Sequence, residues 1–135
     1  MIYIGAGLAT SMMGMLVSEP YTAPTNFYVG FNTSVGGTGE ATYLSTEVDG
    51  YAYTRKEVNL SLVGSELRST NSVTWSNLPA TTIYSLFVSD SSISGSGSVL
   101  YATDLDAPFD VASGSGIMFA TDTLVIAFTS AQLIG

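Results

Sequence analysis

The chain has 135 residues, which is enough for one domain with a single hydrophobic core. It carries three Lys and Arg residues against eleven Asp and Glu residues, for a formal net charge of −8. This charge repels the phosphates of nucleic acids and anionic membrane surfaces, so we expect neither as a partner. The sequence contains no Cys and no His, which excludes disulfides, thiolate nucleophiles, the commonest zinc ligands and every His-dependent catalytic triad.

Charged residues make up only 10% of the chain and apolar residues 46%, whereas roughly one quarter of the residues in an ordinary globular domain are charged. A neutral surface suits a permanent interface, because burying a charge there costs more than burying a hydroxyl group. We therefore expect a module that works by assembly with other subunits. The alternative is a monomer whose surface is coated with Ser and Thr.

The first segment, MIYIGAGLATSMMGMLVSEP, is uncharged up to Glu19. It lacks the basic start of a signal peptide and is interrupted by glycines, so we expect mature structure rather than a leader or membrane anchor. The spacing of its large apolar residues predicts a short helix over residues 7–17, which ends before Pro20. Residues 1–24 are interpreted as an N-terminal arm or short helix used for docking.

Methionine side chains adapt to irregular gaps, so the Met-rich part of this arm favours contact with a neighbouring subunit. The alternative is that the arm covers the core of its own domain. The residues predicted to dock are Ile2, Tyr3, Leu8, Met12, Met13, Met15 and Leu16.

From Asn26 onward, short runs of aromatic and β-branched residues are separated by turn residues. Strands are expected in NFYVGF, YAYTRKEVNLSL, SVTW, TIYSLFV, SVLYATDL, GIMFA and TLVIAF. Loops are expected in SVGGTGEAT, SDSSISGSGS and DAPFDVASGSG, where Gly, Ser and Asp gather. The pattern predicts an all-β fold, a jelly-roll-like or Ig-like antiparallel β-sandwich formed as one domain by residues 25–135.

Side-chain alternation within these runs predicts which residues are buried. Val58, Leu60 and Leu62 alternate with polar residues and are expected on a buried face. The large aromatic residues are expected mainly in the core, and those singled out are Phe27, Trp75, Phe87 and Phe128.

Two of the three basic residues stand side by side in EVDGYAYTRKEV, just after an Asp-Gly turn. Alternation places Tyr51, Tyr53 and Arg55 on one face of the expected strand. A guanidinium group can form a forked bond to a carboxylate and stack on an aromatic ring. We therefore predict that Arg55, with Tyr53 beside it, is a structural ion-pair or interface residue. The alternative is a solvated charge that protects a strand edge from unwanted pairing.

Several motifs contain residue types that can support catalysis or ligand binding. GGTGEAT lacks the Lys-Ser/Thr ending of a phosphate loop, and no helix is expected to follow it. Asp104, Asp106 and Asp110 lack the spacing of an EF-hand loop and are expected in a solvated acidic turn. No spacing brings two carboxylates together for glycoside hydrolysis, and a Ser nucleophile would depend on Lys56, the single Lys. We expect no catalytic activity, no cofactor and no metal site.

The order of three stretches carries a family resemblance. They are FYVGFNTSVGGTGEATYLSTEVDGYAYTRKEV, NSVTWSNLPATTIYSLFVSDS and GSVLYATDLDAPFDVASGSGIMFATDTLVIAF. Together they resemble the small virion proteins of tailed phages that are often labelled tail fibre proteins, over residues 26–128. Matching positions include Glu47, Val48, Gly50, Tyr53 and Arg55 in a hairpin, Asn71, Val73 and Trp75 after it, and Leu100, Tyr101, Leu105 and Pro108 later. The resemblance implies a β-rich virion component that is homotrimeric or otherwise symmetric.

These observations lead to an expected function. The chain is interpreted as a non-enzymatic bacteriophage virion protein, a capsid decoration (cement) protein that binds the outer capsid surface as a symmetric oligomer, expected to be a homotrimer, and stabilises the shell. Its expected partners are further copies of itself and the major capsid protein or other virion subunits. The alternative is a tail fibre or receptor-binding module in which residues 35–42 or 89–98 contact the host surface.

Overall fold

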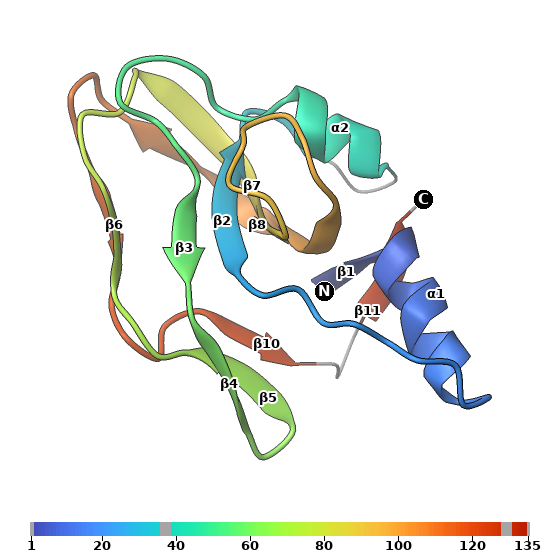
Figure 1. Cartoon of the computed structure of the whole chain (residues 1–135). Coiled ribbons are helices and arrows are strands. Elements are labelled where there is room, and N and C mark those ends of the chain that lie inside the picture. The colour runs from blue at the N-terminus through green and yellow to red at the C-terminus, as the bar shows by residue number, and fades with distance from the viewer. Residues whose placement is uncertain (1, 36–38, 128–130, 135) are drawn as a thin grey trace.

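The computed structural model describes residues 2–35, 39–127 and the backbone of residues 131–134. These residues are mostly β-structure, with one short helix near the N-terminus and a second one later in the chain (Figure 1). The elements are β1 (Ile2–Gly5), α1 (Ala6–Met15), β2 (Phe27–Asn32), α2 (Glu40–Ser45), β3 (Lys56–Val58), β4 (Leu60–Val63), β5 (Glu66–Ser69), β6 (Val73–Trp75), β7 (Thr81–Ser89), β8 (Val99–Val111), β9 (Ile117–Phe119), β10 (Val125–Ala127) and β11 (Ala131–Ile134).

The largest sheet has the strand order β11-β1-β8-β7-β2-β3. Its pairs are antiparallel except β1 with β11, which run parallel and bring the two ends of the chain side by side. Two smaller sheets, β10-β5-β4 and β6-β9, are also antiparallel. The predicted all-β sandwich and its short N-terminal helix are confirmed.

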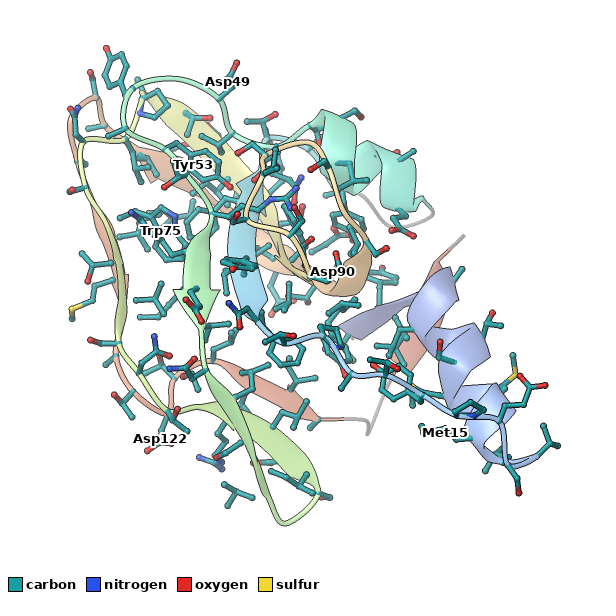
Figure 2. All side chains as sticks on the ribbon, in the orientation of Figure 1. Met15, Asp49, Tyr53, Trp75, Asp90 and Asp122 are labelled. Atoms are coloured by element: carbon teal, nitrogen blue, oxygen red, sulfur yellow. The ribbon has the colours of Figure 1, made fainter. Side chains whose placement is uncertain are left out.

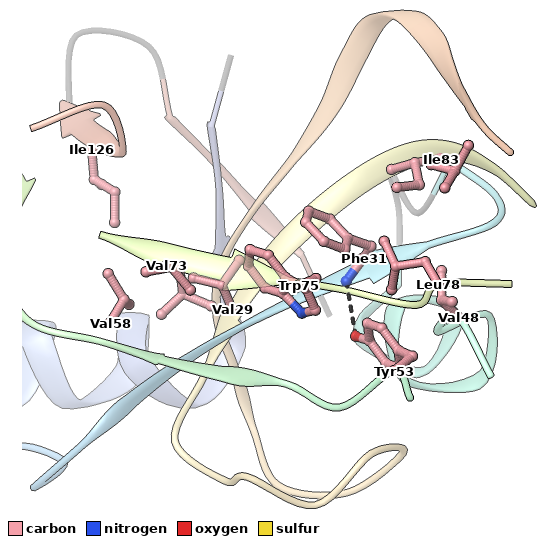
Figure 3. Close-up of a cluster of buried hydrophobic side chains, with 12 residues drawn as sticks. Val29, Phe31, Val48, Tyr53, Val58, Val73, Trp75, Leu78, Ile83 and Ile126 are labelled. Carbon is pink, nitrogen blue, oxygen red and sulfur yellow. Dashed lines mark hydrogen bonds between the residues drawn. The ribbon is translucent and has the colours of Figure 1, made fainter. Parts of the chain in front are cut away.

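The main core lies between the large sheet and the two smaller sheets. Phe31 of the large sheet meets Trp75 of β6 with ring centroids 4.5 Å apart, and Trp75 meets Phe119 of β9 edge-on at 5.8 Å. The indole Nε1 of Trp75 donates to the carbonyl of Thr54 at 2.9 Å, so the buried ring also has its polar group satisfied. Figure 3 shows Phe31 and Trp75 among aliphatic side chains of the same core.

A second, smaller core covers the opposite face of the large sheet. Tyr43 of α2 packs there with Phe87, Val99 and Ala102, and all four are buried. Of the aromatic residues predicted to be in the core, Trp75 and Phe87 are fully buried and Phe27 is partly buried. Phe128 lies outside the described residues.

Two predicted loops are wrong in part. The stretch SVGGTGEAT ends inside a helix, because its last three residues, 40–42, begin α2. The Glu40 carboxylate accepts a hydrogen bond from the Val99 N–H at 2.8 Å, and Tyr43 is buried against the sheet. Tertiary contacts thus stabilise a helix that the glycine-rich composition does not favour. The acidic stretch 104–110 is not a turn but continues β8 as far as Val111.

Strand β8 accommodates its proline through an irregular register. Ile83 lies opposite Phe109, but Ser85 lies opposite Asp104, so residues 105–108 bulge out against a single residue of β7. Pro108 lies in this bulge, where its missing N–H leaves no gap in the ladder. The bulge opens one side of the sandwich.

The buried face predicted for β4 ends early. Val58 is buried and Leu60 is partly buried, but the Leu62 side chain is 72% exposed. Leu62 lies near the tip of the β4–β5 hairpin, which extends beyond the rest of the sandwich (Figure 1). The predicted alternation of side chains along β4 is correct. Among the described residues, however, no second sheet covers Leu62 at this point.

Candidate functional site

The 90–98 loop joins β7 to β8, and its shape is fixed by hydrogen bonds. The Asp90 Oδ1 atom accepts from the Ser98 N–H at 2.8 Å, which closes the loop at its base. Ser96 donates through its N–H and hydroxyl groups to the Ile93 carbonyl. The Ile93 side chain projects from the loop and is exposed. A polar, glycine-containing loop of this kind is expected to be mobile, yet this one is tightly bonded.

A buried ion pair beneath the 90–98 loop helps to hold the loop in one conformation. The Glu47 carboxylate accepts forked bonds from Arg55, with Nε at 3.0 Å from Oε2 and the terminal nitrogen at 3.0 Å from Oε1. It also accepts from the Tyr53 hydroxyl at 2.6 Å and from the Gly95 N–H at 2.8 Å. The carboxylate is therefore fully bonded, and one of its donors belongs to the loop.

The other terminal nitrogen of Arg55 continues the connection into the loop. It donates to the Ser89 hydroxyl at 3.1 Å and to the carbonyls of Ser91 and Ser96, each at 2.8 Å. The guanidinium carbon also lies 5.0 Å from the centre of the Phe87 ring, which supports it through a cation–π contact. One arginine thus ties both sides of the loop to the sheet.

Tyr53 links this polar cluster to the main core. Its hydroxyl donates to Glu47 and accepts from the Phe31 N–H at 3.1 Å (Figure 3). Burial, followed by the nearby negative charge of Glu47, raises the pKa of Tyr53 far above its ordinary value. The phenol therefore stays protonated and serves as a donor, which is a structural role.

Gly30 makes room for the cluster in the middle of β2. A Cβ atom at this position would lie 2.5 Å from the Phe87 ring and 2.9 Å from the Glu47 carboxylate. Both side chains can therefore cross over the backbone of β2. A glycine inside an otherwise aromatic strand is the sequence signal for such a close approach.

Beside the loop lies a surface depression that we call the polar hollow. Its volume is about 460 Å³, and an adjoining cavity of about 160 Å³ extends it toward α1. The hollow is lined by Thr22, Ala23, Pro24, Thr25, Asn26, Tyr28 and Asp90. Asp90 is the one charged side chain among the described residues that line either cavity, and Asn26 donates to the Tyr28 hydroxyl at 3.2 Å. Such a surface suits a neutral, polar ligand.

The family model for podophage GP4 fiber I protein gp80 matches residues 6–127. The chain belongs to this family. No curated protein matches the sequence. Membership makes the chain a phage virion protein of the fibre type, in agreement with the resemblance seen in its sequence.

In this fibre-family chain, the residues predicted to dock fall into two groups. Ile2 and Tyr3 belong to β1, a strand of the large sheet, and their side chains are partly buried. The others lie on α1 or directly after it, and none of the α1 residues is fully buried. The docking role stays a prediction, but a separate arm can begin only at Ala6, because residues 2–5 are paired with β8 and β11.

Arg55 and Tyr53 lie inside the domain. The predicted structural ion pair of Arg55 is present, and the alternative of a solvated edge charge is wrong, because the side chain is buried against Glu47. Residues 50–53 form a turn rather than a strand, so Tyr51 is exposed instead of sharing the face of Tyr53. A role for Arg55 and Tyr53 at an interface stays a prediction, and their burial leaves them little surface for a partner.

Sequence reasoning missed Glu47 as the partner of Arg55 and Asp90 as part of the hollow. Glu47 had a signal, because one of the few acidic residues stands eight positions before Arg55 within one matched hairpin. For Asp90 the sequence carried no signal beyond its place in an expected loop. Among the described residues, no group of three or more acidic side chains is arranged to hold a metal ion, and no helix is long and apolar enough to cross a membrane.

Proposed function

We propose that the chain is a non-enzymatic structural component of a phage tail fibre, which acts by binding other virion subunits and the host surface. The observation that carries the proposal is the match to a fiber I protein over residues 6–127. The ionisable cluster of Glu47, Tyr53 and Arg55 fits this role, because its groups bond to one another and to a loop backbone rather than facing a cavity.

The position of the protein on the particle tests this proposal directly. We expect an antibody against the chain to label the tail region of purified virions in electron micrographs. Quantitative mass spectrometry should then give a small number of copies per particle. Label over the whole capsid, with a copy number close to that of the major capsid protein, would contradict the fibre role and support capsid decoration instead.

For attachment, we propose that α1 and the residues directly after it bind a neighbouring virion subunit. Met13, Met15, Leu16 and Val17 are all exposed, and Figure 2 shows Met15 at the end of α1 that lies far from the sandwich. Apolar side chains gathered at one place on a protein mark a contact surface. A homotrimer is the proposed form of the assembled fibre component.

Substitution within the segment tests attachment better than deletion, because deletion from residue 2 would remove β1. Met13→Asp with Leu16→Asp should leave the thermal unfolding of the isolated protein unchanged and abolish its incorporation into virions. Leu62→Asp, at another exposed apolar position, is the matched control. Incorporation of the double variant at the normal level would show that α1 is not the attachment point. Sedimentation measurements on the same proteins give the oligomeric state.

We also propose that the 90–98 loop and the polar hollow face the host. A loop held rigid before binding loses little entropy on contact, which favours affinity. Ile93→Asp at the loop tip should lower the rate of phage adsorption to host cells, with Leu62→Asp again as the control. Equal adsorption of both variant phages and the parent would remove this loop from the receptor contact.

A further inference from the structure

The polar hollow has the size of a small-molecule site but a more polar lining than such sites usually have. Its volume of about 460 Å³ lies within the range of about 300–1,000 Å³ that is usual for ligand pockets, most of which are lined by apolar side chains. Here the lining includes hydroxyl, amide, phenol and carboxylate groups, from Thr22, Thr25, Asn26, Tyr28 and Asp90. A ligand that fits this lining must itself carry several hydrogen-bonding groups.

Polar groups in the hollow are free to bind a ligand. Asp90 is exposed and uses Oδ1 to accept from the Ser98 N–H, whereas its Oδ2 atom has no hydrogen bond among the described residues. The Tyr28 hydroxyl accepts from the Asn26 amide at 3.2 Å, so its own proton is available to a ligand. The hollow therefore offers a charged acceptor and a hydroxyl donor.

The two groups are held in place before any ligand binds. Tyr28 lies opposite Ser89 in the pairing of β2 with β7, and Asp90 directly follows Ser89. Gly97, with a φ of +81°, keeps space beside the carboxylate, because a Cβ atom there would lie 2.9 Å from the Asp90 Oδ1 atom and 2.5 Å from the Ser91 Cβ atom. A site formed in advance loses little entropy on binding.

Two observations restrict the class of ligand. Tyr28 is paired on both sides, with Glu57 of β3 and with Ser89 of β7, so a peptide cannot add to β2 as a further strand at this point. Asp90 is the one charged side chain among the described residues that line the hollow and the adjoining cavity, and the chain has a net charge of −8. Nucleotides, phosphates and acidic sugars are therefore repelled. A neutral sugar fits both restrictions, because its hydroxyl groups donate and accept hydrogen bonds and its C–H groups pack on a tyrosine ring.

We propose that the polar hollow binds a neutral saccharide. Hydroxyl groups of the sugar donate to the free carboxylate oxygen of Asp90 and accept from the Tyr28 hydroxyl. Asn26 holds that hydroxyl in position and supplies its amide oxygen as a further acceptor. The role of the site in host contact rests on the function proposed above, whereas sugar binding itself is measured on the isolated chain.

Methyl glycosides of glucose, galactose and mannose test the proposal on the full chain. The three differ in the orientation of their ring hydroxyl groups, and each is compared with the glycoside of the matching uronic acid, which carries a carboxylate. We expect at least one neutral glycoside to shift the NMR amide signals of Asn26, Tyr28 and Asp90, and its acidic counterpart to bind at least about tenfold more weakly. Binding of none of the neutral glycosides would overturn the proposal. Equal binding of the acidic form, or equal shifts with glycerol, would also overturn it.

Two variants with the same change of charge locate the binding. Asp90→Asn keeps an oxygen for the Ser98 N–H but replaces the free carboxylate oxygen by an amide nitrogen, so glycoside binding should weaken by about tenfold or more. Asp122 is also exposed, and Figure 2 shows it far from Asp90, so Asp122→Asn should bind like the parent. Thermal unfolding of both variants establishes that they fold. Equal binding by Asp90→Asn and the parent would overturn the assignment of the site.

Phage adsorption distinguishes a failure of this proposal from a failure of the proposed host contact. If Asp90→Asn loses glycoside binding and phages carrying it still adsorb like the parent, the saccharide site is supported and the host contact through the hollow is wrong. If no neutral glycoside binds and Ile93→Asp still slows adsorption, the host contact is supported and the saccharide site is overturned.

Discussion

Two Arg–Glu pairs in this small domain differ mainly in their surroundings. Arg55 and Glu47 are 3.0 Å apart, with side chains 0% and 4% exposed. Arg68 and Glu66 are closer, at 2.7 Å, but their side chains are 37% and 35% exposed. The shorter distance belongs to the pair in water, where charge attraction is weak and is screened by salt. Burial, not distance, therefore decides how much each pair matters to the fold.

The buried pair also differs in what depends on it. Arg55 and Glu47 bond to backbone groups of the 90–98 loop, whereas the Arg68 side chain has no hydrogen bond among the described residues other than those to Glu66, two residues away. Loss of one partner of the buried pair would leave a charge in the interior and release a loop. Loss of one partner of the exposed pair would leave a solvated charge on a hairpin.

The largest effect is expected from Arg55→Met. The Glu47 carboxylate would stay buried without its counter-charge, and the loop would lose two hydrogen bonds from Arg55, to the carbonyls of Ser91 and Ser96. Removing one partner of a buried ion pair typically lowers the free energy of unfolding by about 3–5 kcal/mol. Urea unfolding followed by tryptophan fluorescence measures this, since Trp75 is the single Trp and is buried.

A second variant shows whether the charge or the shape is responsible. Arg55→Met combined with Glu47→Leu removes both charges and should regain part of the lost stability, because a buried pair can often be replaced by apolar residues. If the double variant is less stable than Arg55→Met, the hydrogen bonds to the loop outweigh the unpaired charge. The greater importance of the buried Arg–Glu pair would then come from its hydrogen bonds to the loop rather than from charge attraction.

Gly30→Ala should have the next largest effect. The added methyl group would meet the Phe87 ring at 2.5 Å and the Glu47 carboxylate at 2.9 Å, so the buried pair would have to shift. Overpacking of this kind costs typically about 1–3 kcal/mol. Gly64→Ala is the control, since a Cβ atom at Gly64 would meet nothing within 4 Å, although its positive φ adds a small strain. Equal stability of the parent and Gly30→Ala would mean that the cluster can adapt.

The period-two pattern was sufficient to predict the all-β class and most strand positions. It worked where a strand is buried on alternate residues, as in β3 and β6. It failed where long-range contacts decide the local structure. Residues 40–45 are helical because Tyr43 packs on Phe87 across the sheet, and nothing near them in the sequence carries that information.

The candidate site was predictable only in outline. An Arg among tyrosines indicated an ion pair, because a guanidinium group needs a carboxylate when it is buried. The choice of Glu47 among the acidic residues depends on how the turn at residues 50–53 folds back, which sequence alone does not provide. Nothing in the sequence indicated the apolar depression of about 510 Å³ beside β8 and β9, because residues of the β8 bulge and of the short strand β9 line it together.

Tyr53→Phe should have a smaller effect than Arg55→Met. It removes the hydroxyl that donates to Glu47 and leaves the buried Phe31 N–H without its acceptor. A lost buried hydrogen bond of this kind costs about 1–3 kcal/mol. Because the folded-state pKa of Tyr53 is raised, the unfolded chain loses this proton first when the pH rises above about 10. Stability of the parent should then fall with rising pH, and the fall should be less steep in Tyr53→Phe.

Arg68→Met should have the smallest effect, and it tests the comparison most sharply. Arg68 makes the shorter of the two ion pairs, so a view based on distance expects a loss at least as large as that of Arg55→Met. A view based on burial expects about 0–1 kcal/mol, which should disappear in 1 M salt because the charges are screened over about 3 Å. Urea unfolding of both variants at low and high salt distinguishes these views, since the loss in Arg55→Met should persist when that of Arg68→Met has vanished.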